Sequence, residues 1–264
     1  MTMQPPPPAP IPVVPAATVT PIVKPTIAII NETTVLTDAE AAKAVPSFQK
    51  QVSGDFAPLW GRDANLVFVP RGGKVPPGAW QQALLDNADQ AGALGYHDKT
   101  ADGHPLGKIF VKTTQTYGGN WTVTASHELL EMLGDPDIVR CVFLQTAEEA
   151  GTLYAYEACD AVEDDSLGYT IDGIVVSDFV TQEWFDPGHY NTVFSFKRNV
   201  KSPLVLADGG YIGYFKVGRG SGWQQLTARG LPPKAHQLAL PGSRRERRAR
   251  GHHNWSHSTA HAGE

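Results

Sequence analysis

One stretch, residues 122–137, constrains the fold of this chain more than any other, because it predicts a short helix with a single polar face. At about 100° per residue, His127, Glu128 and Glu131 fall within about 100° of arc, whereas the leucines lie outside it. The sequence Gly-Asp-Pro follows the last leucine and is typical of a helix end. We therefore expect a largely buried helix that carries an imidazole and two carboxylates on one face.

The spacing of these polar residues resembles the zinc-binding motif of the zincin metallopeptidases. In H-E-x-x-H, two histidines bind zinc and the first glutamate is the general base. Here His127 and Glu128 open the motif, and Glu131 replaces the second histidine. Gly134 and Asp137 then follow His127 by seven and ten residues, which is similar to the metzincin spacing H-E-x-x-H-x-x-G-x-x-H with Asp as the third ligand. This H-E-x-x-E resemblance implies a metal held by His127, Glu131 and Asp137.

A second acidic stretch, residues 152–165, offers an alternative third ligand. In the gluzincins, another zincin branch, a glutamate of a later helix completes the site, so the resemblance leaves Glu157 as the alternative to Asp137. A calcium site is also open, because carboxylates suit Ca²⁺, although the spacing does not fit an EF-hand loop. The metzincin Met-turn has no counterpart, since Met132 lies inside the predicted helix and the other two methionines lie in the first three residues.

The order of the predicted elements adds to the resemblance. We expect a β-rich segment at 27–36, a helix from Ala41 to about Asp55 behind an S/T-x-x-E capping box at 37–40, and strands at 65–69 and 108–112. Residues 80–86 fit either a strand or a short helix, and we favour a strand. Pro46 should kink or split the helix. In zincins, such a twisted mixed sheet carries a backing helix and the active-site helix. The segment 92–97 matches the edge strand that binds an extended peptide by strand addition.

Downstream of the acidic stretch the chain becomes β-rich. A hairpin is expected at 168–177, and further strands at 193–196, 204–206 and 211–217. The prediction is an α+β, zincin-like fold, with an N-terminal subdomain at 26–137 and a β-rich C-terminal subdomain at 138–230 that closes the cleft from below.

The two ends differ from this body. Residues 1–25 contain nine of the 21 prolines and predict an extended or disordered leader. Residues 231–264 are rich in arginine and histidine and predict a disordered tail. Two more specific functions for this tail are binding to an acidic partner and scavenging of metal ions by its histidines. No run of ~18 apolar residues and no signal-peptide pattern is recognised, so we expect a soluble protein without a membrane span and leave its location open.

Other chemistries find less support. The chain has no G-x-S-x-G nucleophile elbow and no phosphate-binding G-x-x-x-x-G-K-[ST]. Its two cysteines, Cys141 and Cys159, could pair or stay free.

The resemblance therefore implies a metal-dependent hydrolase that cleaves peptide bonds in an extended peptide or protein by metal-activated water, with Glu128 as general base. Zinc is the expected ion, with manganese or calcium as alternatives, because an oxygen-rich ligand set weakens the preference for zinc. Two carboxylates also neutralise the ion, so a slow enzyme is expected. The alternatives are a catalytically inactive zincin-fold module for binding or structure, and an unrelated α/β protein in which the motif is coincidental.

Overall fold

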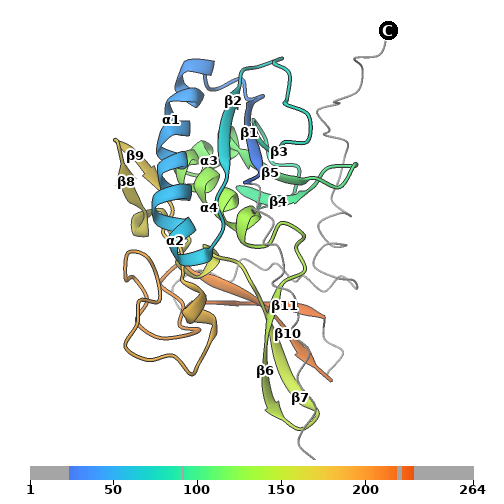
Figure 1. The fold of residues 1–264 in the computed structure, drawn as a ribbon, viewed down its shortest axis with the longest axis vertical. Coiled ribbons are helices and arrows are strands. Elements are labelled where there is room, and N and C mark those ends of the chain that lie inside the picture. The colour runs from blue at the N-terminus through green and yellow to red at the C-terminus, as the bar shows by residue number, and fades with distance from the viewer. Residues whose placement is uncertain (1–23, 91, 219–221, 229–264) are drawn as a thin grey trace, which may run out of the picture.

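The computed structural model describes residues 24–90, 92–218 and 222–228. These residues form an α+β fold, as the sequence predicts. In Figure 1 one sheet and the longer helices occupy one half of the molecule, and a second sheet lies in the other half. The predicted tail 231–264, and all of the predicted leader 1–25 except its last two residues, lie outside the described residues. No helix within the described ranges is long and apolar enough to cross a membrane.

The first sheet has five strands in the order β2-β1-β3-β5-β4. Their bounds are Thr26–Asn31 for β1, Asn65–Val69 for β2, Trp80–Leu85 for β3, Gly95–Lys99 for β4 and Pro105–Phe110 for β5. Neighbouring strands run parallel except β4, which pairs antiparallel with β5. The sheet is therefore mixed, with β4 at one edge. Strand β5 overlaps the predicted strand at 108–112 but ends earlier than predicted, at Phe110.

The helices of this half cover one side of the sheet. They are α1 (Asp38–Lys50), which continues through a π-helical turn (Gln51–Phe56) into α2 (Ala57–Trp60), then α3 (Val111–Thr116) and α4 (Trp121–Gly134). Alternate residues of β1, Ile27 and Ile29, belong to the same apolar cluster as Phe48 of α1 and Leu129 of α4. This cluster packs the motif helix α4 against the sheet.

Helix α1 begins at the predicted capping box. The side chain of Thr37 accepts a hydrogen bond from the backbone N–H of Glu40, and the Glu40 carboxylate accepts one from the N–H of Thr37. Of the two predicted effects of Pro46, a kink or a split, the split is wrong, because the α-helix runs through Pro46 to Lys50. Proline removes one backbone donor, but Phe48 beside it is fully buried, and its packing supports the helix across the missing bond.

The second half contains an antiparallel sheet in the order β11-β10-β7-β6. Its strands are β6 (Cys141–Ala147), β7 (Ala150–Ala155), β10 (Tyr211–Val217) and β11 (Trp223–Thr227). A separate hairpin joins β8 (Tyr169–Ile171) to β9 (Ile174–Val176), and positive φ angles at Asp172 (50°) and Gly173 (82°) confirm the predicted two-residue turn. Short 3₁₀-helices occupy Asp160–Val162, Asp165–Leu167 and Gln182–Phe185.

Two of the predicted strands, at 193–196 and 204–206, are wrong. The first segment contributes only an isolated β-bridge at Ser195, and no strand forms in the second. Leu204 (φ 55°), the first residue of the second segment, adopts a left-handed backbone conformation, which a strand does not accommodate. Arg198 (φ 62°), two residues after the first segment, does the same. Phe194 and Phe196 of the first segment pack in or against the apolar core without forming a strand.

Both halves share one apolar core. The same cluster contains Ile27 of β1, Trp184 of the last 3₁₀-helix and Ile212 of β10. The indole Nε1 of Trp60 also donates a hydrogen bond of 2.9 Å to the carbonyl of Val180 across the two halves. The segment from 138 onward therefore packs on the N-terminal half rather than standing apart from it.

Gly210 allows close contact between β10 and the 3₁₀-helix Asp160–Val162. A Cβ atom at Gly210 would lie 2.6 Å from the carbonyl carbon of Ala161, and backbone cannot give way there. We expect Gly210→Ala to lower the free energy of unfolding by about 1–3 kcal/mol in urea denaturation, as overpacking does. The matched control is Gly54→Ala, whose new Cβ meets nothing within 4 Å. Equal stability of the two variants would contradict this packing.

Candidate functional site

Helix α4 brings the polar face of the motif into the interior. Its N-terminus is capped by Asn120, whose side chain accepts a hydrogen bond from the backbone N–H of Thr122. His127 and Glu128 are each 7% exposed, and Glu131 is 2% exposed. The predicted helix is confirmed, and all three polar side chains are buried.

The imidazole of His127 lies between two carboxylates. Its Nε2 is 3.3 Å from Oε1 of Glu131 and 3.3 Å from Oδ1 of Asp160. Oε1 of Glu131 also accepts hydrogen bonds from the backbone N–H groups of Cys159 and Asp160. The start of the 3₁₀-helix Asp160–Val162 is thereby fixed to α4 by Glu131.

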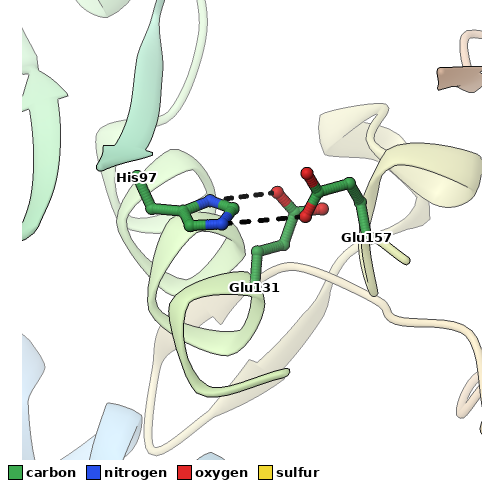
Figure 2. Close-up of side chains that lie close together, drawn as sticks. All are labelled: His97, Glu131 and Glu157. Atoms are coloured by element: carbon green, nitrogen blue, oxygen red, sulfur yellow. Dashed lines mark ion pairs between the residues drawn. The ribbon is translucent and has the colours of Figure 1, made fainter. Parts of the chain in front are cut away.

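A second imidazole reaches the same place from the edge strand β4. His97 is fully buried, and Figure 2 shows its ring facing the carboxylates of Glu131 and Glu157. Its Nδ1 lies 3.5 Å from Oε2 of Glu128 and 3.8 Å from Oε2 of Glu131. Its Nε2 lies 3.8 Å from Oε2 of Glu157. The site therefore draws on β4, on α4 and on the chain that follows β7.

Four of the five residues that the sequence suggested are brought together. His127, Glu128 and Glu131 offer ligand atoms that all lie within 4.8 Å of one another. The same holds for His97, Glu131 and Glu157, so Glu131 belongs to both groups. Glu157 joins the site from an irregular segment after β7, not from a helix as in the gluzincin pattern.

Asp137 belongs to neither group. Its side chain is 57% exposed and pairs with Lys99 at the end of β4. The metzincin pattern requires a turn at Gly134, but here Gly134 is the last residue of α4 and packs against Trp60, whose ring would lie 3.2 Å from an added Cβ. The turn that follows is instead fixed by Asp135, which accepts hydrogen bonds from two later backbone N–H groups. The chain consequently leaves α4 without returning to His127.

Sequence reasoning missed His97 and Asp160 as site residues. The signal for His97 was the glycine two positions before it, since residues i and i+2 of a strand share a face. A Cβ at Gly95 would lie 2.9 Å from Cγ of Glu128, so this face of β4 approaches α4 closely. Asp160 stood in the acidic stretch, but only the turn after β7 brings it to His127.

The charges of the site perturb one another strongly. Burial works to lower the pKa of His127, but the charge of Glu131 and the hydrogen bond to Asp160 outweigh it and hold that pKa well above its usual value. Burial works to raise the pKa of Glu131, yet the nearby His127 lowers it to about 2. Burial and the charge of Glu131 raise the pKa of Asp160 to about 6. Perturbations of this kind are typical of functional sites.

The donor set fits a divalent cation. Four buried carboxylates, those of Glu128, Glu131, Glu157 and Asp160, outnumber the two imidazoles, so the site stays negative even with both imidazoles protonated. Buried charges are ordinarily paired or coordinate a metal. A cavity of about 520 Å³ adjoins the cluster and is lined by His127, three of these carboxylates and aromatic residues such as Trp223. Part of the cluster therefore borders an open cavity.

Comparison with known proteins adds no relative. None of the family models, curated proteins or solved structures compared with this chain matches it. The geometry of the site is therefore the basis for a function.

The two cysteines allow a test of whether the site is buried on the side of Cys159. They form no disulfide bond with each other. Cys141 is partly exposed, whereas Cys159 is buried next to Glu131, and burial raises the pKa of its thiol well above the usual value. We expect one thiol of the native protein to react rapidly with a disulfide reagent near pH 8, and both to react in urea. Cys141→Ser should abolish the rapid phase. Rapid reaction of Cys159 in the native protein would contradict the burial of its side chain.

Proposed function

We propose that this chain is a zincin-like, metal-dependent hydrolase that cleaves peptide bonds. The proposal is supported by a mixed sheet with helix α1 on one side, by the motif helix α4, and by an antiparallel edge strand, β4, beside α4. The observation that carries the proposal is the convergence of His127, Glu128 and Glu131 beside a cavity that His127 and Glu128 line.

The distances around His127 favour metal coordination. Separations of 3.3 Å from Nε2 to Glu131 and to Asp160 exceed the usual N–H···O distance of about 2.9–3.0 Å. Ligands about 2.1 Å from a tetrahedral zinc ion lie about 3.4 Å apart. His127 and Glu131 are therefore the proposed ligands, with Glu157 or Asp160 as the third in place of Asp137. Zinc is the first choice, and manganese or calcium remain alternatives because carboxylates dominate the set.

Glu128 is placed to act as the general base. A bound divalent cation would polarise the scissile carbonyl and acidify a water molecule. Glu128 lines the cavity, and its carboxylate would accept the proton of that water and return it to the leaving amine. The imidazole of His97 lies beside this carboxylate, with Nδ1 3.5 Å from Oε2 of Glu128. The edge strand β4 supplies backbone groups along which an extended peptide would bind.

An inactive zincin-fold module is the second candidate. Glu131 accepts hydrogen bonds from two backbone N–H groups, so it has a structural role in addition to any coordination of a metal. A cation held mainly by carboxylates is also a weaker Lewis acid than one held by imidazoles, which favours slow chemistry or none.

Replacing the proposed base separates these two candidates. We expect Glu128→Gln to reduce cleavage of an unstructured protein by about 10²–10⁴-fold, because a neutral amide accepts no proton. Cleavage is measured with zinc-loaded protein. Glu163→Gln is the matched control, since Glu163 lines the same cavity but belongs to neither group. Wild-type protein without any cleavage would support the inactive module.

Replacing the proposed histidine ligand tests the metal. We expect His127→Ala to lower the zinc content measured by equilibrium dialysis and elemental analysis, because the remaining ligands on α4 are carboxylates. Asp137→Ala should leave the content unchanged, since its carboxylate lies at the surface beside Lys99. Undiminished zinc in His127→Ala would defeat the metal site.

A further inference from the structure

We propose that the site holds two divalent cations, with a second position formed by His97, Glu131 and Glu157. The ligand atoms of these three residues lie within 4.8 Å of one another, as do those of the first group on α4. This inference rests on the proposed function in one respect: the first cation is the one that His127 is proposed to bind. It adds a ligand, His97, that comes from the sheet and lies outside the helix motif.

The two oxygens of Glu131 face different imidazoles. Oε1 lies 3.3 Å from Nε2 of His127, and Oε2 lies 3.8 Å from Nδ1 of His97. A carboxylate in this position can bind one cation through each oxygen and bridge them. Glutamate at this position therefore gains a purpose that the histidine of H-E-x-x-H could not serve, since only one imidazole nitrogen ordinarily binds a metal.

The surroundings of His97 suit a cation ligand. The ring is fully buried, and three carboxylates, those of Glu128, Glu131 and Glu157, lie within 3.5–3.8 Å of its nitrogens. Glu157 is itself only 4% exposed (Figure 2). One imidazole and two carboxylate oxygens are a ligand set that zinc and manganese both accept.

Charge balance also favours two cations over one. The four buried carboxylates carry four negative charges when ionised, and two divalent cations would balance them with both imidazoles neutral. With both imidazoles neutral, a single divalent cation would leave a net charge of −2 on these six side chains in a largely buried cluster, where net charge is costly. Paired cations about 3.5–4 Å apart occur in aminopeptidases and phosphatases.

Zinc stoichiometry of the full-length chain tests the proposal. The sequence after residue 250 contains four further histidines, so metal bound elsewhere is measured with the double variant His97→Ala/His127→Ala and subtracted. We expect two zinc ions in wild type, one in His97→Ala and one in His127→Ala. His104→Ala, which removes a partly exposed histidine beside Asp102, should retain two.

The outcomes separate this proposal from the proposed function. The second position alone would be overturned if wild type bound one zinc ion and cleaved substrate, and if His97→Ala bound the same amount of zinc. No zinc above the background of the double variant would overturn both. A spectroscopic measurement on wild type avoids any folding defect of the variants: protein loaded with Mn²⁺ should give the electron paramagnetic resonance signal of an exchange-coupled pair. A spectrum of isolated Mn²⁺ ions only would refute the pair.

Discussion

The burial of several carboxylates around Glu131 is the constraint on which the rest of this structure depends. Each ionised carboxylate loses hydration on burial, and like charges near one another repel. The imidazoles of His97 and His127 offset part of this cost, and so do the hydrogen bonds that Glu131 accepts from two backbone N–H groups. These contacts reduce the cost but leave more carboxylates than imidazoles, and in the proposed function a cation would balance the remaining charge.

Close backbone approaches make this convergence possible. Gly95 lets β4 lie against α4, so that His97 on the same face reaches Glu128 and Glu131. Gly210 lets β10 pack on the segment that carries Asp160. The site is therefore assembled from elements far apart in sequence, and larger residues at either glycine would separate them. Its chemistry depends on packing as much as on the motif.

Local signals in the sequence were sufficient for much of the fold. The capping box at Thr37, the turn at Asp172 and the end of α4 at Gly134 each follow from a few neighbouring residues, and the structure confirms them. The segments around 193–206 were not predictable in this way, because their aromatic residues fill the core without a strand. Side-chain composition signals burial there, but it does not determine backbone conformation.

The candidate site was predictable only where one helix carries it. His127, Glu128 and Glu131 follow from helical periodicity, whereas Asp137 was placed by analogy with a turn that Gly134 does not make. His97 comes from a strand about thirty residues earlier, and its position depends on the pairing of β4 with β5. Single-sequence reasoning gives no register for that pairing, so it could not place this imidazole at the site.

Thermal unfolding with and without a divalent cation tests the account most directly. A cation that binds the folded cluster stabilises it by about 2.7 kcal/mol at a hundredfold excess over Kd. For a domain of this size, that corresponds to a rise in Tm of about 5–10 °C. We predict such a rise for wild type with Zn²⁺ or Mn²⁺, reversed by a chelator and lost in Glu131→Gln. An unchanged Tm at saturating cation would contradict the claim that these buried carboxylates form a metal site.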